Sequence, residues 1–208
     1  MAPPESSLDT ATSFYPQQPT CQIPQLHFLL SRFLGERSDG TYVEVGAYDG
    51  VFVSNTWGLA ERGWRGLMVE PVPQLAALCR TNHAGHPAVT VVETAIGPAD
   101  QREVTLHLAG TLTTANPDAF EEYASIEWAA PSLTNETVVV PCRTLDELLA
   151  DQAVVTGFDV LVVDVEGFEA QVFAGFDFAF WRPRMLIVEL VETHPDLFRN
   201  ADGDARLG

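Results

Sequence analysis

Residues 42–50 read Tyr-Val-Glu-Val-Gly-Ala-Tyr-Asp-Gly, an apolar run that carries an acid and ends in a turn with two glycines. A second apolar run, residues 66–69, is followed by another acid, Glu70, about 20 residues further along. Glycines in such a turn let backbone N–H groups approach a ligand, and an acid after the next strand accepts hydrogen bonds from ribose hydroxyls. The sequence therefore predicts a nucleotide-like ligand.

The glycine spacing distinguishes two classes of cofactor. Dinucleotide-binding proteins usually carry G-x-G-x-x-G, whose second glycine admits a pyrophosphate, but here Ala47 and Tyr48 follow Gly46 and the next glycine is Gly50. An acid two residues before the first glycine, as Glu44 is, is typical of class I methyltransferases that bind the cationic S-adenosylmethionine, which a carboxylate attracts. A plain strand-to-helix turn with a solvated Glu44 stays open as an alternative.

Length and composition indicate one domain. The chain has 208 residues, of which 46% are hydrophobic, enough for one substantial core. Residues 1–24 are rich in Pro, Ser, Thr and Gln and predict an irregular arm. We expect the single domain to occupy residues 25–208.

The charge restricts the partners. The net charge is −18, from 11 basic and 29 acidic residues, and such a field repels phosphate backbones and anionic lipid. We therefore expect neither nucleic acid nor membrane as a partner. Cys21, Cys79 and Cys142 match no disulfide framework or zinc motif. The sequence shows no signal peptide and no apolar run of roughly 18 residues, which predicts a cytoplasmic protein.

Apolar strands alternate with helical patterns along most of the chain. We predict strands at residues 41–45, 66–69, 89–97, 158–164 and 185–189, and helices at residues 25–34, 54–62, 73–82 and 168–174. This alternation is typical of a doubly wound, Rossmann-like α/β sheet, in which ligands bind outside the carboxyl ends of the strands.

One region departs from the alternation. Residues 103–108 and 137–142 read as two strands, antiparallel to each other, around the polar segment 109–136. Long segments of this kind in a compact domain are commonly functional, so we expect residues 109–136 to be a specificity insert. Thr144 and Glu147 then match a capping box that opens a short helix.

An acid stands near the end of each of the five predicted strands. These acids are Glu44, Glu70, Glu93, Asp164 and Glu189. For each acid separately, a helix cap or a solvated loop position is an alternative.

Taken in order, these motifs resemble those of FkbM-family methyltransferases. The resemblance runs from residue 41 to residue 195 and rests on Val43-Glu44-Val45-Gly46-Ala47-x-x-Gly50, residues 63–71, residues 95–97, residues 144–146, residues 163–169 and Val188-Glu189. It implies a class I methyltransferase that transfers a methyl group from S-adenosylmethionine to a hydroxyl of a small acceptor, a sugar or a secondary metabolite.

The resemblance also implies a set of site residues. The cofactor would be bound by Glu44, Gly46, Ala47, Gly50, Glu70, Pro71, Thr94, Ala95 and Asp164. The glycine turn would wrap the methionine part, Glu70 would hold the ribose, and Thr94 and Ala95 would border the adenine. Asp164 would sit between donor and acceptor.

Methyl transfer is an in-line displacement, so the protein mainly aligns the acceptor oxygen and accepts its proton. We predict Asp164 as the base or orienting group, with Glu189 and His194 as further candidates. Alternatively, Asp164, Glu189 and Glu192 could hold a divalent cation that lowers the pKa of the acceptor hydroxyl, although a metal is not expected because the ligand spacing is loose.

Two other functions stay open: a nicotinamide-dependent oxidoreductase, and a non-catalytic cofactor-binding or scaffold domain. Class I methyltransferases normally end in a helix and an antiparallel strand pair. Here only 19 residues follow Glu189, and they include Pro195 and Gly203. We therefore expect that strand pair to be missing. A second protomer could cover the exposed sheet edge, which makes a homodimer possible.

Overall fold

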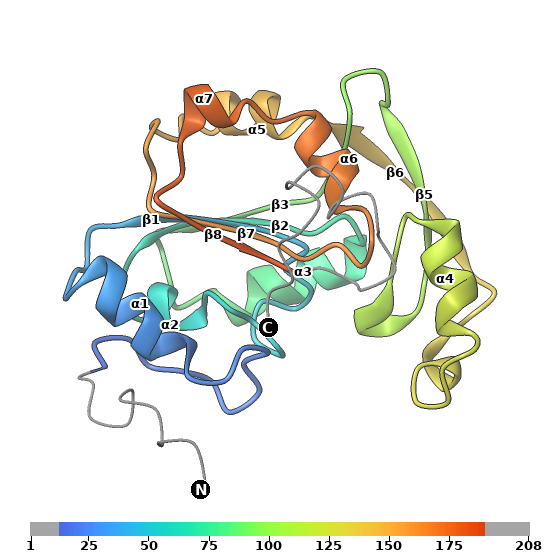
Figure 1. Ribbon diagram of the computed structural model, residues 1–208, viewed down its shortest axis with the longest axis horizontal. Coiled ribbons are helices and arrows are strands. Elements are labelled where there is room, and N and C mark those ends of the chain that lie inside the picture. Colours follow the sequence, from blue (N-terminus) through green and yellow to red (C-terminus); the bar gives the residue numbers. More distant parts are fainter. Residues whose placement is uncertain (1–12, 190–208) are drawn as a thin grey trace, which may run out of the picture.

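The computed structural model describes residues 13–189 and shows a parallel sheet with helices on both faces (Figure 1). The strand order is β3-β2-β1-β7-β8, and all neighbours are parallel. The strands are β1 (Thr41–Val45), β2 (Arg65–Val69), β3 (Val89–Val92), β7 (Val160–Val163) and β8 (Met185–Val188). The order reverses at β1, where doubly wound sheets open a crevice for ligands. The predicted Rossmann-like fold class is confirmed.

Three helices cover each face of this sheet (Figure 1). One face carries α1 (Leu26–Leu34), α2 (Trp57–Glu61) and α3 (Pro73–Asn82), and the other carries α5 (Leu145–Asp151), α6 (Glu169–Ala174) and α7 (Phe178–Trp181). The predicted capping box is present at α5, where the Thr144 hydroxyl accepts from the Glu147 N–H and the Glu147 carboxylate accepts from the Thr144 N–H, both at 3.1 Å. Such a cap stabilises a helix by about 1 kcal/mol.

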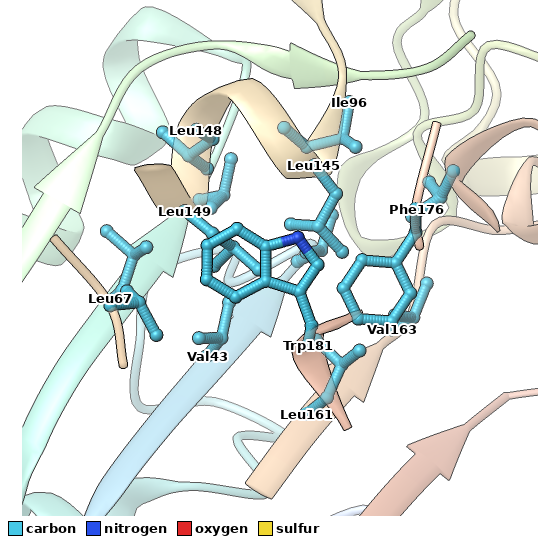
Figure 2. Packing of buried hydrophobic residues seen from close by; sticks show 14 of the residues in the cluster. Val43, Leu67, Ile96, Leu145, Leu148, Leu149, Leu161, Val163, Phe176 and Trp181 are labelled. Atoms are coloured by element: carbon cyan, nitrogen blue, oxygen red, sulfur yellow. The ribbon is translucent and has the colours of Figure 1, made fainter. Parts of the chain in front are cut away.

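The core beneath α5, α6 and α7 is organised around one aromatic side chain. Figure 2 shows Trp181 among aliphatic side chains of the sheet, such as Val43 and Leu67, and of α5, such as Leu148 and Leu149. These strands are apolar on both faces, as expected of a sheet that helices cover on both sides.

The opposite core includes part of the N-terminal segment. Leu26, Leu30 and Leu34, which share the apolar stripe of α1, are buried against the sheet. Tyr15 is only 2% exposed, and its ring lies edge-on to Trp64 at 5.7 Å between centroids. Residues 13–24, the described part of the predicted arm, thus contain no helix or strand and yet contribute to the core.

The expectation of one continuous strand over residues 89–97 is wrong. The chain leaves the central sheet after Val92, and β4 (Ala95–Ile96) pairs instead with β6 (Thr137–Arg143), which also pairs with β5 (Glu103–His107). The buried Thr94 hydroxyl lies at the bend and donates to the Pro141 carbonyl at 3.2 Å. Residues 89–97 suit a strand throughout, and this local pattern does not reveal that β3 and β4 pair with different strands. The predicted antiparallel pairing of residues 103–108 with residues 137–142 is confirmed.

Residues 109–136 fold into α4 (Pro117–Tyr123) and the two short 3-10 turns η1 (Gly110–Leu112) and η2 (Ala130–Ser132). They form a small core of their own, which includes Leu112, Ala119 and Tyr123. With β5 and β6, this segment lies to one side of the central sheet (Figure 1).

The helix-start residues expected at 54–56 behave differently. Thr56 does precede α2, but its side chain caps no helical N–H group. The Thr56 hydroxyl instead donates to the Glu44 carboxylate at 2.7 Å, because that acid is buried next to it and needs a donor.

Several expectations concern the C-terminal residues. Glu192, His194 and the missing strand pair lie outside the described residues. Within residues 13–189, no helix combines the length and the apolar character that crossing a membrane requires.

Candidate functional site

One cavity lies where β1, β2 and β7 end, and the β4–β5 region and the insert complete its wall. The empty space in it, including the open mouth, is about 620 Å³. The lining includes six predicted site residues: Gly46, Glu70, Pro71, Thr94, Ala95 and Asp164. We call this space the first cavity.

Glu70 ties the glycine turn to the end of β2. Its carboxylate accepts from the N–H of Tyr48 at 2.9 Å and from the N–H of Val72 at 2.8 Å. Burial raises the pKa of Glu70 to about 7, against the two backbone hydrogen bonds, which lower it. Each carboxylate oxygen has a further lone pair, so Glu70 can still accept hydrogen bonds from a ligand.

Gly46 allows the close approach of two strand ends. Its φ is +90°, and a Cβ at this position would lie 1.7 Å from the Asp164 carbonyl oxygen. Only glycine fits there, because L side chains rarely adopt this φ and the neighbour is backbone. The residue thus brings the turn after β1 against the loop after β7.

Three other predicted cofactor residues do not line this cavity. Glu44 points away from it and is buried beside Thr56, where burial raises its pKa to about 7. Ala47 is buried among the residues under α1 and α2. The carbonyl of Gly50 lies 2.9 Å from His83 Nε2. Roles for these three residues in ligand binding stay predictions.

Three carboxylates meet after β7 and β8. Asp164, Glu166 and Glu189 each place an oxygen within 4.8 Å of the others. Burial, and then the neighbouring Glu189, raise the pKa of Asp164 strongly. Burial also raises the pKa of Glu166 to about 7. Like charges this close disfavour joint ionisation, which contributes to the raised pKa of Asp164.

Glu166 was not predicted as a site residue, because acids at a helix start complement the helix dipole in any case. Its φ of +54° lies in the left-handed region, and its side chain lies near Asp164 and does not cap α6. Carboxylate oxygens grouped in this way are ligands that Mg²⁺ or Ca²⁺ accepts, so Asp164, Glu166 and Glu189 are the described residues that could hold a divalent cation.

The insert is anchored to this acidic loop. The Thr114 hydroxyl donates to the Glu166 carbonyl at 2.7 Å, and the Asn116 amide donates to the Gly167 carbonyl at 2.9 Å. The Tyr123 hydroxyl donates to the Glu166 carboxylate. Thr111 and Thr113 line the first cavity. The insert is therefore in place to influence what this cavity accepts.

A second cavity lies on the other side of Asp164. It has a volume of about 480 Å³, including its mouth, and is lined by Gln22, Ile23, Asn55, Val162, Asp164, Ile187, Val188 and Glu189. Asp164 lines both cavities, so the proposed base separates two spaces. Glu189, predicted as a catalytic candidate, lines only the second cavity.

The parallel sheet, with a cavity outside its carboxyl edge at the reversal of strand order, defines a Rossmann-like ligand-binding protein. The sequence profile of the Methyltransferase FkbM domain matches residues 44–207. The chain therefore belongs to the FkbM methyltransferase family, as its motifs indicated.

Other similarities are weaker. The solved structure of precorrin 8W decarboxylase from Methanobacterium thermoautotrophicum is 16% identical, and the match covers 92% of this chain and 80% of that chain with a TM-score of 0.38. A likeness at this level carries no argument. No curated protein sequence matches the chain significantly.

Proposed function

We propose that the chain is an S-adenosylmethionine-dependent O-methyltransferase that acts on a hydroxyl group of a small molecule, a sugar or a secondary metabolite. The observation that supports this most is the charge of the first cavity. Its described lining residues include Glu70, Asp164 and Glu166, and none of those in residues 13–189 is Lys, Arg or His. Such a lining favours a cofactor with cationic groups and disfavours a phosphate-bearing one.

The glycine turn supports the same choice. The N–H groups of Gly46 and Ala47 both donate to the Val69 carbonyl at 3.0 Å, and that of Gly50 donates to the Ala47 carbonyl at 2.8 Å. The N–H of Tyr48 is bonded to Glu70. A pyrophosphate needs free N–H groups in this turn, so a nicotinamide cofactor fits poorly.

The family and the fold suggest how the cofactor is held. Gly46 would contact its methionine part, Glu70 would accept hydrogen bonds from its ribose, and Thr94 and Ala95 would border its adenine. When bound, the cofactor would supply a methyl group already activated by a positive sulfur.

Asp164 and Glu189 would serve the acceptor. A carboxylate at this position can accept the proton of the acceptor hydroxyl as the oxygen bonds to the methyl carbon. The electrons of the broken carbon–sulfur bond stay on sulfur. No step in this scheme requires a metal.

The test is a calorimetric titration of the full chain with S-adenosylmethionine, S-adenosylhomocysteine and NAD. We expect micromolar binding of both adenosyl ligands and none of NAD. Binding of NAD alone would support the oxidoreductase alternative, and binding of none of the three would contradict the proposal.

A further inference from the structure

The second cavity has its own polar network. The Asn55 amide donates to the Gln22 side-chain oxygen at 2.9 Å, and the Gln22 amide donates to Glu189 Oε1 at 2.9 Å. Glu189 in turn lies against Asp164. A continuous chain of contacts therefore runs from the N-terminal segment to the proposed base.

Half of its described lining residues are aliphatic. They are Val162 of β7, Ile187 and Val188 of β8, and Ile23. A ring with an apolar face and polar substituents matches such a surface, because the C–H groups pack on the aliphatic side chains and the hydroxyls reach the rim.

The charge of the cavity restricts its ligand further. Among the residues 13–189 that line it, the polar side chains are two amides and two acids, and none is Lys, Arg or His. An anionic ligand would meet Asp164 and Glu189, and no cationic side chain of the described lining compensates them, which is unfavourable. A neutral hydroxyl can donate to either carboxylate, and an ammonium group can pair with one.

From these observations we infer that the second cavity binds the methyl acceptor, and that the acceptor is an uncharged or amine-bearing hydroxyl compound and not a phosphorylated or acidic one. Gln22 and Asn55 select it, and Asp164 lies between it and the first cavity. This inference rests on the proposed function.

The test uses the full chain saturated with S-adenosylhomocysteine. Saturation-transfer NMR measures binding of methyl glucoside and glucosamine as neutral and cationic probes, and of glucose 6-phosphate and glucuronate as anionic probes. We expect transfer to at least one of the first two and to neither anion. Equal or stronger transfer to an anionic probe, or transfer to none of the four, would overturn the inference.

Gln22→Ala should lower the affinity for the probe that binds about three- to tenfold, as expected when one hydrogen bond is lost. Gln18→Ala is the matched control, because Gln18 belongs to the same segment and does not line this cavity. Unchanged probe affinity in Gln22→Ala would count against the assignment.

Calorimetry of the same variants separates the two proposals. Gln22 does not line the first cavity, so S-adenosylmethionine should bind Gln22→Ala as it binds the wild type. If the wild-type chain fails to bind S-adenosylmethionine, the proposed function is wrong. If it binds the cofactor and none of the probes, only the acceptor assignment is wrong.

Discussion

Glu70 combines two tasks at one position, because it ties the glycine turn to β2 and lines the first cavity. Glu70→Ala should weaken S-adenosylmethionine binding by about 1–3 kcal/mol, since charge-assisted hydrogen bonds are lost. Titration calorimetry measures this.

Glu93→Ala is the control, because Glu93 also follows a strand of the central sheet but is exposed beside Arg80 and does not line the cavity. Wild-type affinity in Glu70→Ala would refute the assignment to the ribose.

The buried Glu44 should make the stability of the protein depend on pH. Its pKa is about 7 in the folded protein against an ordinary value of 4.5, so the folded state binds more protons between these values. The contribution of Glu44 to the free energy of unfolding is therefore fully present below pH 4.5 and is lost as the pH rises through 7. The loss is about 3 kcal/mol at most.

Glu44→Gln removes this titration. The melting temperature of the variant relative to the wild type should therefore increase between pH 5 and pH 8. Glu121→Gln, at an exposed position, should show no such trend. A constant difference for Glu44→Gln would mean that Glu44 does not titrate in this range.

Asp164 is the proposed base. Asp164→Asn should strongly reduce methyl transfer to an identified acceptor while the protein stays folded, because the amide cannot accept the proton of the hydroxyl. Asp100→Asn, at an exposed position, should leave methyl transfer unchanged.

Full methyl transfer by Asp164→Asn would exclude it from the mechanism. Addition of EDTA should leave transfer by the wild-type chain unchanged, and loss of activity would instead favour a cation at the three carboxylates.

At the scale of elements, the contact between the turn after β1 and the loop after β7 depends on Gly46. Gly46→Ala should destabilise the fold by more than about 3 kcal/mol, because its Cβ would collide with the Asp164 carbonyl and its φ is unfavourable for alanine. Urea denaturation measures the change.

Gly63→Ala separates the two causes. Gly63 has a similar φ of +79° but no atom near the position of a Cβ, so only the backbone cost of about 1 kcal/mol applies. If both substitutions lower the free energy of unfolding equally, the surrounding backbone must move to accommodate the new Cβ at position 46.

For the whole molecule, residues 13–24 are part of the core. Tyr15→Ala should destabilise the protein by about 3–5 kcal/mol, as expected for a buried aromatic side chain. Tyr15→Phe should cost only about 1 kcal/mol, for the hydrogen bond from the Tyr15 hydroxyl to the Gly35 carbonyl. Thermal stability close to the wild type in Tyr15→Ala would mean that this segment is dispensable for the fold.

The central sheet, most of its covering helices and six residues of the first cavity could be predicted from local patterns. Apolar runs, glycines and caps report short-range preferences of the backbone, and these gave the strand and helix positions and placed Glu70 and Asp164 at strand ends. The change of partner strand after Val92 was missed, since a strand's own residues do not encode which strand it pairs with.

Three features arise only from contacts between distant residues. Glu44 lies beside Thr56, Asp164 and Glu166 meet Glu189, and Gln22 reaches Glu189 across 167 positions of sequence. The sequence alone determines which residue types are present and which segments form strands or helices, because these follow from neighbours along the chain. The folded chain alone determines which acids meet, which are buried and how their pKa values shift, because burial and electrostatic coupling depend on distance in space.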